Sequence, residues 1–301
     1  MQRLVYILVY PILWIISILP FPLLYAFSDF LYIIIYRIVG YRTKTVRDNL
    51  LLVFPDKPLS EIKTIEKKFY HHLCDMIVEA IKSITISEKE LRKRFVSPNL
   101  PDVLHYEREG RDVVLMLAHY ASWEWFFILN RYTTFRCNAI YKKLKNPYFD
   151  RLVKRVRARY NTYLIPMKSA IPEITKARAR GDVTLNGFVS DQSPKWYAAH
   201  HWNTFMGIPV PVYTGAELIA KRLDMAVLFV KVKKVKRGYY EAYFETITDH
   251  PERFADYEIT DIFLKKVEEQ IYDAPEYFLW THKRWKHRDR LPKEFGKKIN
   301  P

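Results

Sequence analysis

The first feature of the chain is an apolar segment, Leu4–Ser28, that contains no charged residue. Its length of roughly 25 residues is enough to cross a bilayer or to enter one deeply. Pro20 and Pro22 are expected to break the helix, which leaves about 16 apolar residues before them, short for a straight span. We therefore expect a membrane anchor over residues 1–40, with crossing and shallow insertion both open. The alternative is a buried core helix.

Basic residues follow this segment more densely than they precede it. Arg37, Arg42, Lys44 and Arg47 outnumber the single Arg3 on the other side. By the positive-inside rule, residues 41–301 are expected on the cytoplasmic side of the membrane. No small-residue cleavage site follows the apolar run, which argues against a removed signal peptide.

The formal net charge of +16 limits the kinds of partner that the chain attracts. A positive field of this size favours anionic membranes, acidic carrier proteins or nucleic acid, without choosing among them. Cys74 and Cys137 form no C-x-x-C pair, so neither a disulfide framework nor a zinc knuckle is indicated. Reduced thiols in the cytoplasm fit best.

Residues 41–301 alternate between helical and strand-like patterns, which predicts one α/β domain with a largely buried sheet. Apolar residues from Ile62 to Ile84 recur at helical spacing, and Ser60 is the expected cap of that helix. The expected strands lie near residues 113–118, 137–141, 162–165, 183–190, 225–232 and 239–246. The expected helices lie near residues 121–130, 147–159, 171–180 and 215–222.

The sharpest local pattern is an H-x4-E sequence, His119 to Glu124, directly after the predicted strand Val113–Ala118. Open α/β sheets tend to bind ligands at this end of their strands. If the carboxylate folds back on the imidazole, Glu124 fixes the tautomer of His119, whose other nitrogen can then deprotonate a hydroxyl group. A structural pair is the alternative reading of this spacing.

Several motifs in order resemble the lipid A biosynthesis acyltransferase family, the late lauroyl- and myristoyl-type enzymes within the wider glycerolipid and lysophospholipid acyltransferase superfamily. The resemblance covers nearly the whole chain. It rests on the apolar N-terminus and on Arg47-Asp48-Asn49-Leu50, Phe54-Pro55, Leu117-Ala118-His119 through Glu124, Asn146-Pro147 with Asp150 and Arg157, Asp191-Gln192, and Pro275 to Trp285.

This resemblance implies a glycerolipid-acyltransferase-like mixed sheet flanked by helices. It also implies a role in lipopolysaccharide formation at the bacterial inner membrane: transfer of a fatty acyl chain from an acyl carrier protein thioester, or less often coenzyme A, to a hydroxyl of a lipid A precursor or related envelope lipid. His119 would be the general base and Glu124 its partner, with no metal and no cofactor. Arg157 and Asp191 match positions that the family uses in its active-site region.

Arg157 and Asp191 also have simpler interpretations. Arg157 lies in a basic run that is typical of a solvated helix face, although guanidinium groups suit phosphate or carboxylate recognition. Asp191 follows a strand, where it could position Arg157 or a substrate hydroxyl, or cap a turn. The loop Ser193–Trp202 departs from the family pattern, which puts substrate details in doubt. The segment Trp280–Trp285 suits either a membrane interface or packing against the core.

Two further functions stay open. The acceptor could be a lysophospholipid or an amino-acid lipid, with the same chemistry. A non-catalytic, membrane-tethered basic protein would explain the anchor and the charge. It leaves His119, Glu124, Arg157 and Asp191 unexplained, and we find no nucleic-acid-binding module, so we expect an enzyme that does not bind nucleic acid.

Overall fold

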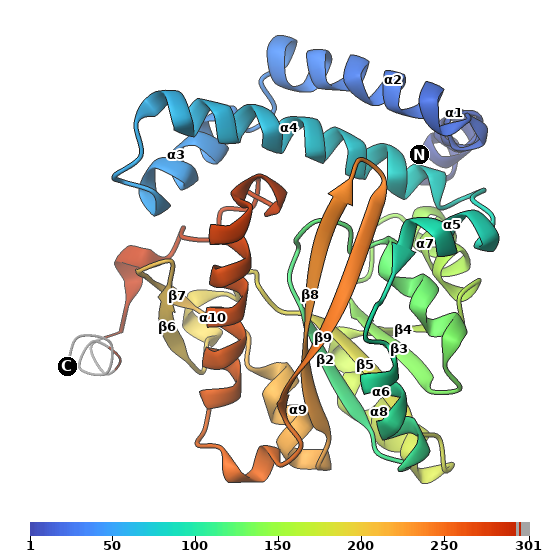
Figure 1. Cartoon of the computed structure of the whole chain (residues 1–301), viewed down its shortest axis with the longest axis vertical. Helices are drawn as coiled ribbons and strands as arrows, with labels where there is room; N and C mark the ends of the chain where they lie inside the picture. The colour runs from blue at the N-terminus through green and yellow to red at the C-terminus, as the bar shows by residue number, and fades with distance from the viewer. Residues whose placement is uncertain (293–294, 296–301) are drawn as a thin grey trace.

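A mixed sheet of seven strands forms the centre of the molecule, and helices flank it (Figure 1). The computed structural model describes residues 1–292 and 295. The strands are β1 (Phe95–Val96), β2 (Val113–Leu117), β3 (Arg136–Tyr141), β4 (Thr162–Pro166), β5 (Thr184–Val189), β6 (Trp202–Phe205), β7 (Ile208–Pro211), β8 (Ala226–Lys236) and β9 (Tyr239–Thr248). The α-helices are α1 (Gln2–Ile18), α2 (Phe21–Tyr32), α3 (Thr43–Val53), α4 (Leu59–Lys82), α5 (Glu88–Arg94), α6 (Pro101–Arg108), α7 (Pro147–Ala158), α8 (Ala170–Ala179), α9 (Gly215–Leu223) and α10 (Glu258–Asp273).

The sheet has the strand order β1-β9-β8-β2-β5-β3-β4, and β6 and β7 form a separate antiparallel pair. Strands β8, β2, β5, β3 and β4 are parallel to one another, whereas β9 runs antiparallel to β8. All five residues of β2 are buried, as expected for a strand covered on both faces. The parallel strands therefore end at one edge of the sheet, and β2 and β5 end there side by side.

The α/β fold predicted from the sequence is confirmed, and the six predicted strands are present with small changes at their ends. Two local predictions are wrong. Helix α4 begins at Leu59, directly after Pro58, so Ser60 lies inside the helix and is not its cap. Residues 121–130 do not form an α-helix, because Ala121 has a φ of 49° and turns the chain. A 3₁₀-helix, η2 (Trp125–Tyr132), follows that turn.

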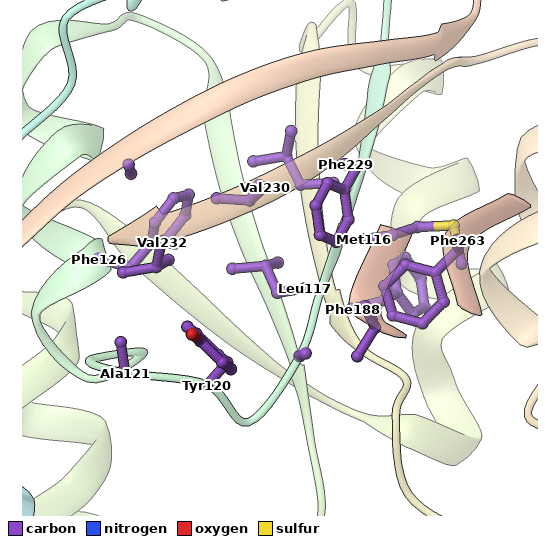
Figure 2. Packing of buried hydrophobic residues seen from close by; sticks show 14 of the residues in the cluster. Met116, Leu117, Tyr120, Ala121, Phe126, Phe188, Phe229, Val230, Val232 and Phe263 are labelled. Carbon is purple, nitrogen blue, oxygen red and sulfur yellow. The ribbon is translucent and has the colours of Figure 1, made fainter. Parts of the chain in front are cut away.

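Packing around the end of β2 fixes where the following turn begins. Figure 2 shows Met116 and Leu117 among the aromatic and β-branched side chains of neighbouring strands, with Tyr120 and Ala121 on the turn that follows. Met116, Leu117, Tyr120 and Ala121 are all buried, as are Phe188 of β5 and Phe229 of β8. A turn anchored on both sides by buried residues gives a defined position to any side chain between them.

The N-terminal helices lie against α4 at the top of the molecule in Figure 1. The expected break is present, because α1 ends at Ile18 and α2 begins at Phe21, whereas Pro11 lies inside α1. Lys82 of α4 donates to the carbonyl oxygens of Ser17 and Leu19 at this break, at 2.8 and 2.7 Å. The lysine thereby satisfies carbonyl groups that the end of a helix leaves without partners.

Both N-terminal helices expose apolar side chains to the surroundings. Within the described residues, one helical stretch, Phe21–Ile38, is long and apolar enough to cross a membrane, with a mean hydropathy of 1.4, and only 17% of it is buried. Helix α1 is shorter, yet Leu4, Ile7, Leu8 and Ile12 are each more than half exposed. An apolar surface of this extent is typical of a membrane-contacting region.

Polar contacts join α2 to α4 along its inner face. Ser28 donates to Asp75 at 2.9 Å, and Tyr25 donates to Glu79 at 2.9 Å. Tyr240 of β9 also donates to Glu79, at 2.9 Å. The carboxylates of α4 therefore connect the N-terminal layer to the β8–β9 hairpin beneath it.

Candidate active site

His119 lies in the turn that leaves the carboxyl end of β2, where the H-x4-E pattern was predicted to lie. A C-terminal segment, Pro275–Trp285, holds the backbone of this turn. Its Leu279 N–H donates to the His119 carbonyl at 3.1 Å, and the Ala121 N–H donates to the Tyr277 carbonyl at 3.0 Å. The turn is therefore fixed by backbone hydrogen bonds on both sides of His119.

The imidazole of His119 is paired with Asp191, which follows the adjacent strand β5. His119 Nδ1 lies 2.7 Å from Asp191 Oδ1, and Gln192 Nε2 lies 3.4 Å from His119 Nε2. This contact with a carboxylate assigns the proton of the neutral ring to Nδ1, since Asp191 can only accept. The ring nitrogen Nε2 is then the one that can accept a proton from a substrate.

The electrostatics of this pair favour its charged form. Burial lowers the pKa of His119, but the Asp191 carboxylate outweighs burial and the pKa is raised above its usual value. Burial likewise raises the pKa of Asp191, yet the charge and hydrogen bond of His119, together with the charge of Arg284, hold it below its usual value. Asp191 is thus an ionised partner for an imidazole that gains a proton.

Glu124 has a different partner from the one expected. Its carboxylate accepts two hydrogen bonds from Arg157 of α7, at 2.6 Å from Nη2 and 3.3 Å from Nε. Among the described residues, Asp191 and Gln192 are the hydrogen-bond partners of the His119 ring, and Glu124 is not one of them. The expected contact between the Glu124 carboxylate and the imidazole is therefore wrong, because the turn at Ala121 directs residues 122–124 toward α7.

The structure thus brings all four predicted residues to one edge of the sheet, but in two pairs that the sequence did not indicate. Asp191 was expected to position Arg157 or a hydroxyl, and it holds His119 instead. Arg157 was expected to bind a phosphate or carboxylate, and the carboxylate that it binds is Glu124. The spacing within H-x4-E carries no information about Asp191, which is 72 residues away from His119 in the chain.

Residues of the C-terminal segment complete the surroundings of Asp191. Arg284 is fully buried, and its Nη1 donates to the Ser193 hydroxyl and to the Pro211 carbonyl, both at 3.0 Å. The Ser193 N–H donates to His282 Nε2 at 3.4 Å. Burial lowers the pKa of His282 to about 4, so this ring is neutral at physiological pH. These residues fix the loop that carries Asp191.

Sequence reasoning noted this C-terminal segment but assigned no site residue to it. Trp280 and Trp285 are buried, and their indole N–H groups donate to Pro275 and Phe205 carbonyls. Of the two open readings, packing against the core is the one that the structure shows. Arg284 was not predicted, and the sequence signal that could have found it is a cation placed between tryptophans in Trp280–Trp285.

An apolar pocket, which we call the sheet pocket, lies beneath the ends of the central strands. It encloses about 590 Å³, a volume that includes the open space at its mouth. Arg157 and Trp123 line it near the predicted catalytic residues, and the Trp123 ring meets the His119 ring edge to face at 5.1 Å. The remaining lining residues are Leu115, Leu117, Phe126, Phe127, Asn130, Cys137, Asn138, Ala139, Ile140, Thr162, Leu185, Gly187 and Val189.

A second apolar pocket, which we call the α4 groove, lies on the other side of Trp123. It encloses about 550 Å³ including its mouth. Its lining consists of Leu73, Met76, Ile77, Glu79 and Ala80 of α4, together with Ser122, Trp123, Glu124 and Leu279. Trp123 is common to both pockets, and the Glu124–Arg157 ion pair joins one pocket to the other.

Comparison with known proteins identifies the family to which the chain belongs. The family model described as bacterial lipid A biosynthesis acyltransferase matches residues 1–287. The chain belongs to the bacterial lipid A biosynthesis acyltransferase family. Its similarity to curated members is modest in identity but extends over nearly the full length of each chain.

Two relatives of this acyltransferase come from Escherichia coli strain K12. The lipid A biosynthesis palmitoleoyltransferase is 23% identical over 282 residues, covering 92% of this chain and 89% of the relative. The lipid A biosynthesis lauroyltransferase is 24% identical over 292 residues, covering 92% of this chain and 90% of the relative. A lipid A biosynthesis acyltransferase of Shigella flexneri matches with 23% identity over 282 residues. The resemblance inferred from the motifs is confirmed, and the chain is an acyltransferase that acts in lipid A biosynthesis.

Proposed function

We propose that this acyltransferase moves a fatty acyl chain from an acyl carrier protein thioester to a hydroxyl group of a lipid A precursor, with His119 as general base. The observation that carries the proposal is the His119–Asp191 pair, 2.7 Å apart and with the aspartate buried, beside an apolar pocket at the carboxyl edge of the sheet. A neutral alcohol attacks a thioester slowly, and a positioned base raises the rate by about 10²–10⁴.

The proposed reaction proceeds without a covalent acyl-enzyme. His119 Nε2 takes the proton of the acceptor hydroxyl while the hydroxyl oxygen attacks the thioester carbonyl carbon. The resulting tetrahedral intermediate then loses the carrier thiolate, which takes the proton back from the imidazolium. Asp191 keeps Nδ1 protonated and stabilises the positive ring between these steps.

Glu124 and Arg157 act as a second unit in this proposal. Arg157 uses Nε and Nη2 to bind Glu124, and it lines the sheet pocket near His119. A guanidinium held in this way can stabilise the negative charge that develops on the thioester oxygen, without reorganising during the reaction. Glu124 therefore acts as the partner of Arg157, and its negative charge also favours the protonated form of His119.

The sheet pocket is the proposed site of the donor acyl chain. Its lining is mainly apolar, and it lies between the strands and η2. Ile140 and Arg157 line the pocket. Exposed basic residues lie close to them in sequence, both after β3 and on α7. They are Lys142, Lys143, Lys145, Arg151 and Arg155. This charge suits an acidic carrier protein, which it would steer toward the pocket.

The exposed apolar faces of α1 and α2 support attachment to a membrane. We propose that residues 1–40 bind the bacterial inner membrane from the cytoplasmic side, with residues 41–301 as the catalytic domain. Helix α2 makes polar contacts with α4 on one face and exposes apolar residues such as Leu23 and Phe30 on others. An amphipathic arrangement of this kind suits a helix that lies in the membrane interface.

The decisive experiment is incubation of the purified full-length chain with acyl carrier protein thioesters or acyl-coenzyme A and a lipid A precursor, read by mass spectrometry. We expect the acceptor mass to increase by one acyl group with the carrier donor, and His119→Ala to abolish the increase. Transfer to lysophospholipids but not to the lipid A precursor would contradict the proposed acceptor. Transfer from coenzyme A alone would contradict the proposed donor.

A further inference from the structure

The α4 groove has no role in the mechanism described above, yet it borders the same catalytic residues. We propose that it binds an acyl chain of the acceptor lipid, while the sheet pocket holds the chain of the donor. This inference rests on the proposed function, since it assigns the second substrate of that reaction to a place on the protein. The proposed ligand of the α4 groove is therefore a lipid acyl chain.

The lining of the α4 groove suits a hydrocarbon chain. Leu73, Met76, Ile77 and Ala80 recur at three- and four-residue steps, so they form one apolar face of α4. Among the described residues that line the groove, none is basic, so it offers no partner for a phosphate or a carboxylate. A fatty acyl chain needs only such apolar contact, because the burial of each methylene group is favourable.

The polar groups of the groove already have partners inside the protein. The Glu79 carboxylate accepts hydrogen bonds from Tyr25 and Tyr240, both at 2.9 Å. The Glu124 carboxylate is bound by Arg157. Because both carboxylates are engaged in this way, an apolar chain in the groove would leave neither of them without a hydrogen bond.

The two pockets share Trp123, whose ring contacts that of His119, with 5.1 Å between the ring centroids. Glu124 lines the α4 groove and its partner Arg157 lines the sheet pocket. A donor chain on one side and an acceptor chain on the other would bring thioester and hydroxyl together beside His119 without sharing space.

The surroundings of the groove favour the acceptor rather than the donor. Helix α4, which forms one wall, is also the helix on which α1 and α2 pack, and these two helices carry the exposed apolar surface (Figure 1). A lipid that remains partly in the bilayer can extend one chain along this apolar surface into the groove. The basic residues proposed to bind a carrier protein lie instead near the sheet pocket.

Ala80→Phe tests the proposal, because Ala80 is exposed at the groove and a larger ring there would fill part of it. We expect the KM for the lipid A precursor to rise about tenfold, the loss that follows when roughly two methylene groups are no longer buried. The KM for the acyl carrier donor should stay unchanged. Ala179→Phe, the same change at an exposed position of α8, should leave both KM values unchanged.

Two results of this experiment would overturn the proposal: a rise in the donor KM alone, or no change in either KM. A second measurement uses the unaltered protein, so that it holds even if Ala80→Phe fails to fold. A lipid A precursor with a diazirine in one acyl chain should label residues 73–80 of α4 on illumination, as mapped by peptide mass spectrometry. Labelling confined to the strand residues of the sheet pocket would reject the groove as the acceptor site.

The unaltered protein also separates the two proposals. If it acylates the diazirine-bearing precursor but α4 is not labelled, the proposed function stands and the groove assignment fails. If it transfers no acyl group to the precursor from any donor, the proposed function itself fails.

Discussion

Asp191 and Glu124 are two carboxylates at one edge of the sheet, each with a basic partner, but their surroundings differ. The Asp191 side chain is 2% exposed and its partner His119 is 21% exposed, whereas Glu124 is 31% exposed and Arg157 is 17% exposed. The inner pair, His119 and Asp191, follows the ends of two adjacent strands. The outer pair, Glu124 and Arg157, joins a turn to α7. A buried pair is sensitive to loss of either member, because the remaining charge has little water to solvate it.

This difference suggests separate tasks. The inner pair includes an imidazole, the side chain whose ordinary pKa lies nearest to neutral pH, so it suits proton transfer. The outer pair holds a permanent cation in a fixed direction beside the sheet pocket, so it suits charge stabilisation and substrate orientation. The predictions below test whether the two pairs act differently, in order of the expected effect.

Loss of the base should have the largest effect. We expect His119→Ala to lower kcat by about 10²–10⁴, because the acceptor hydroxyl then loses its proton acceptor. His250→Ala, a change of the same kind at an exposed histidine outside the site, should leave kcat unchanged. The kcat of both variants is obtained from initial rates of acyl transfer, and circular dichroism checks that each variant is folded. A His119→Ala enzyme with near-normal kcat would remove the imidazole from the mechanism.

Removal of the inner carboxylate should change both the rate and its pH dependence. We expect Asp191→Asn to lower kcat by about 10², because the ring loses the group that orients it and stabilises its charge. The Asp191 carboxylate raises the pKa of His119, so its loss lowers that pKa. The neutral, active base then persists to lower pH, and the acidic limb of the kcat/KM profile should move to lower pH. An acidic limb that stays in place would separate Asp191 from the titration of His119.

The outer pair should behave as one unit with a smaller effect. We expect Glu124→Gln and Arg157→Met each to lower kcat/KM by about tenfold, the value of a charge-assisted hydrogen bond. The double variant should be no worse than the stronger single variant, since residues in contact are not additive. Lys231→Met, which breaks an ion pair with Asp273 away from the site, provides a matched control. Fully additive losses would show that the two residues act independently.

The smallest predicted effect concerns the length of the donor chain. Gly187 lines the sheet pocket, and an added Cβ there would approach Asn138 and Leu117 only to 3.6 and 3.9 Å, ordinary contact distances. We expect Gly187→Val to fill part of the pocket and to shift preference toward shorter acyl donors by about fourfold per methylene group. Gly187→Ala adds a smaller side chain, so it should shift the preference for shorter acyl donors less. Competition between donors of different length measures the preference, and an unchanged ranking would argue against this pocket.

Much of the fold could be predicted because its signals are local. The buried run of β2, the helical spacing of α4 and the proline break before α2 each depend on neighbouring residues. The strands β6 and β7 were not predicted, because each has only four residues. The helix α10 was also missed, although its buried residues Ile259, Phe263, Val267 and Ile271 recur at helical spacing. The apolar N-terminus was evident from composition, whereas its packing along α4 depends on distant polar partners such as Asp75.

Motifs in the sequence were enough to select His119, Glu124, Arg157 and Asp191 as candidate site residues. Their pairing could be seen only in the three-dimensional fold. Asp191 joins His119 across 72 residues of chain, and Arg157 joins Glu124 across 33. The parallel strands β2 and β5 end side by side, which brings Asp191 to His119. The chain turns at Ala121, between His119 and Glu124, and the Glu124 carboxylate pairs with Arg157 of α7. Both pairs thus depend on how distant segments pack, which local sequence patterns do not encode.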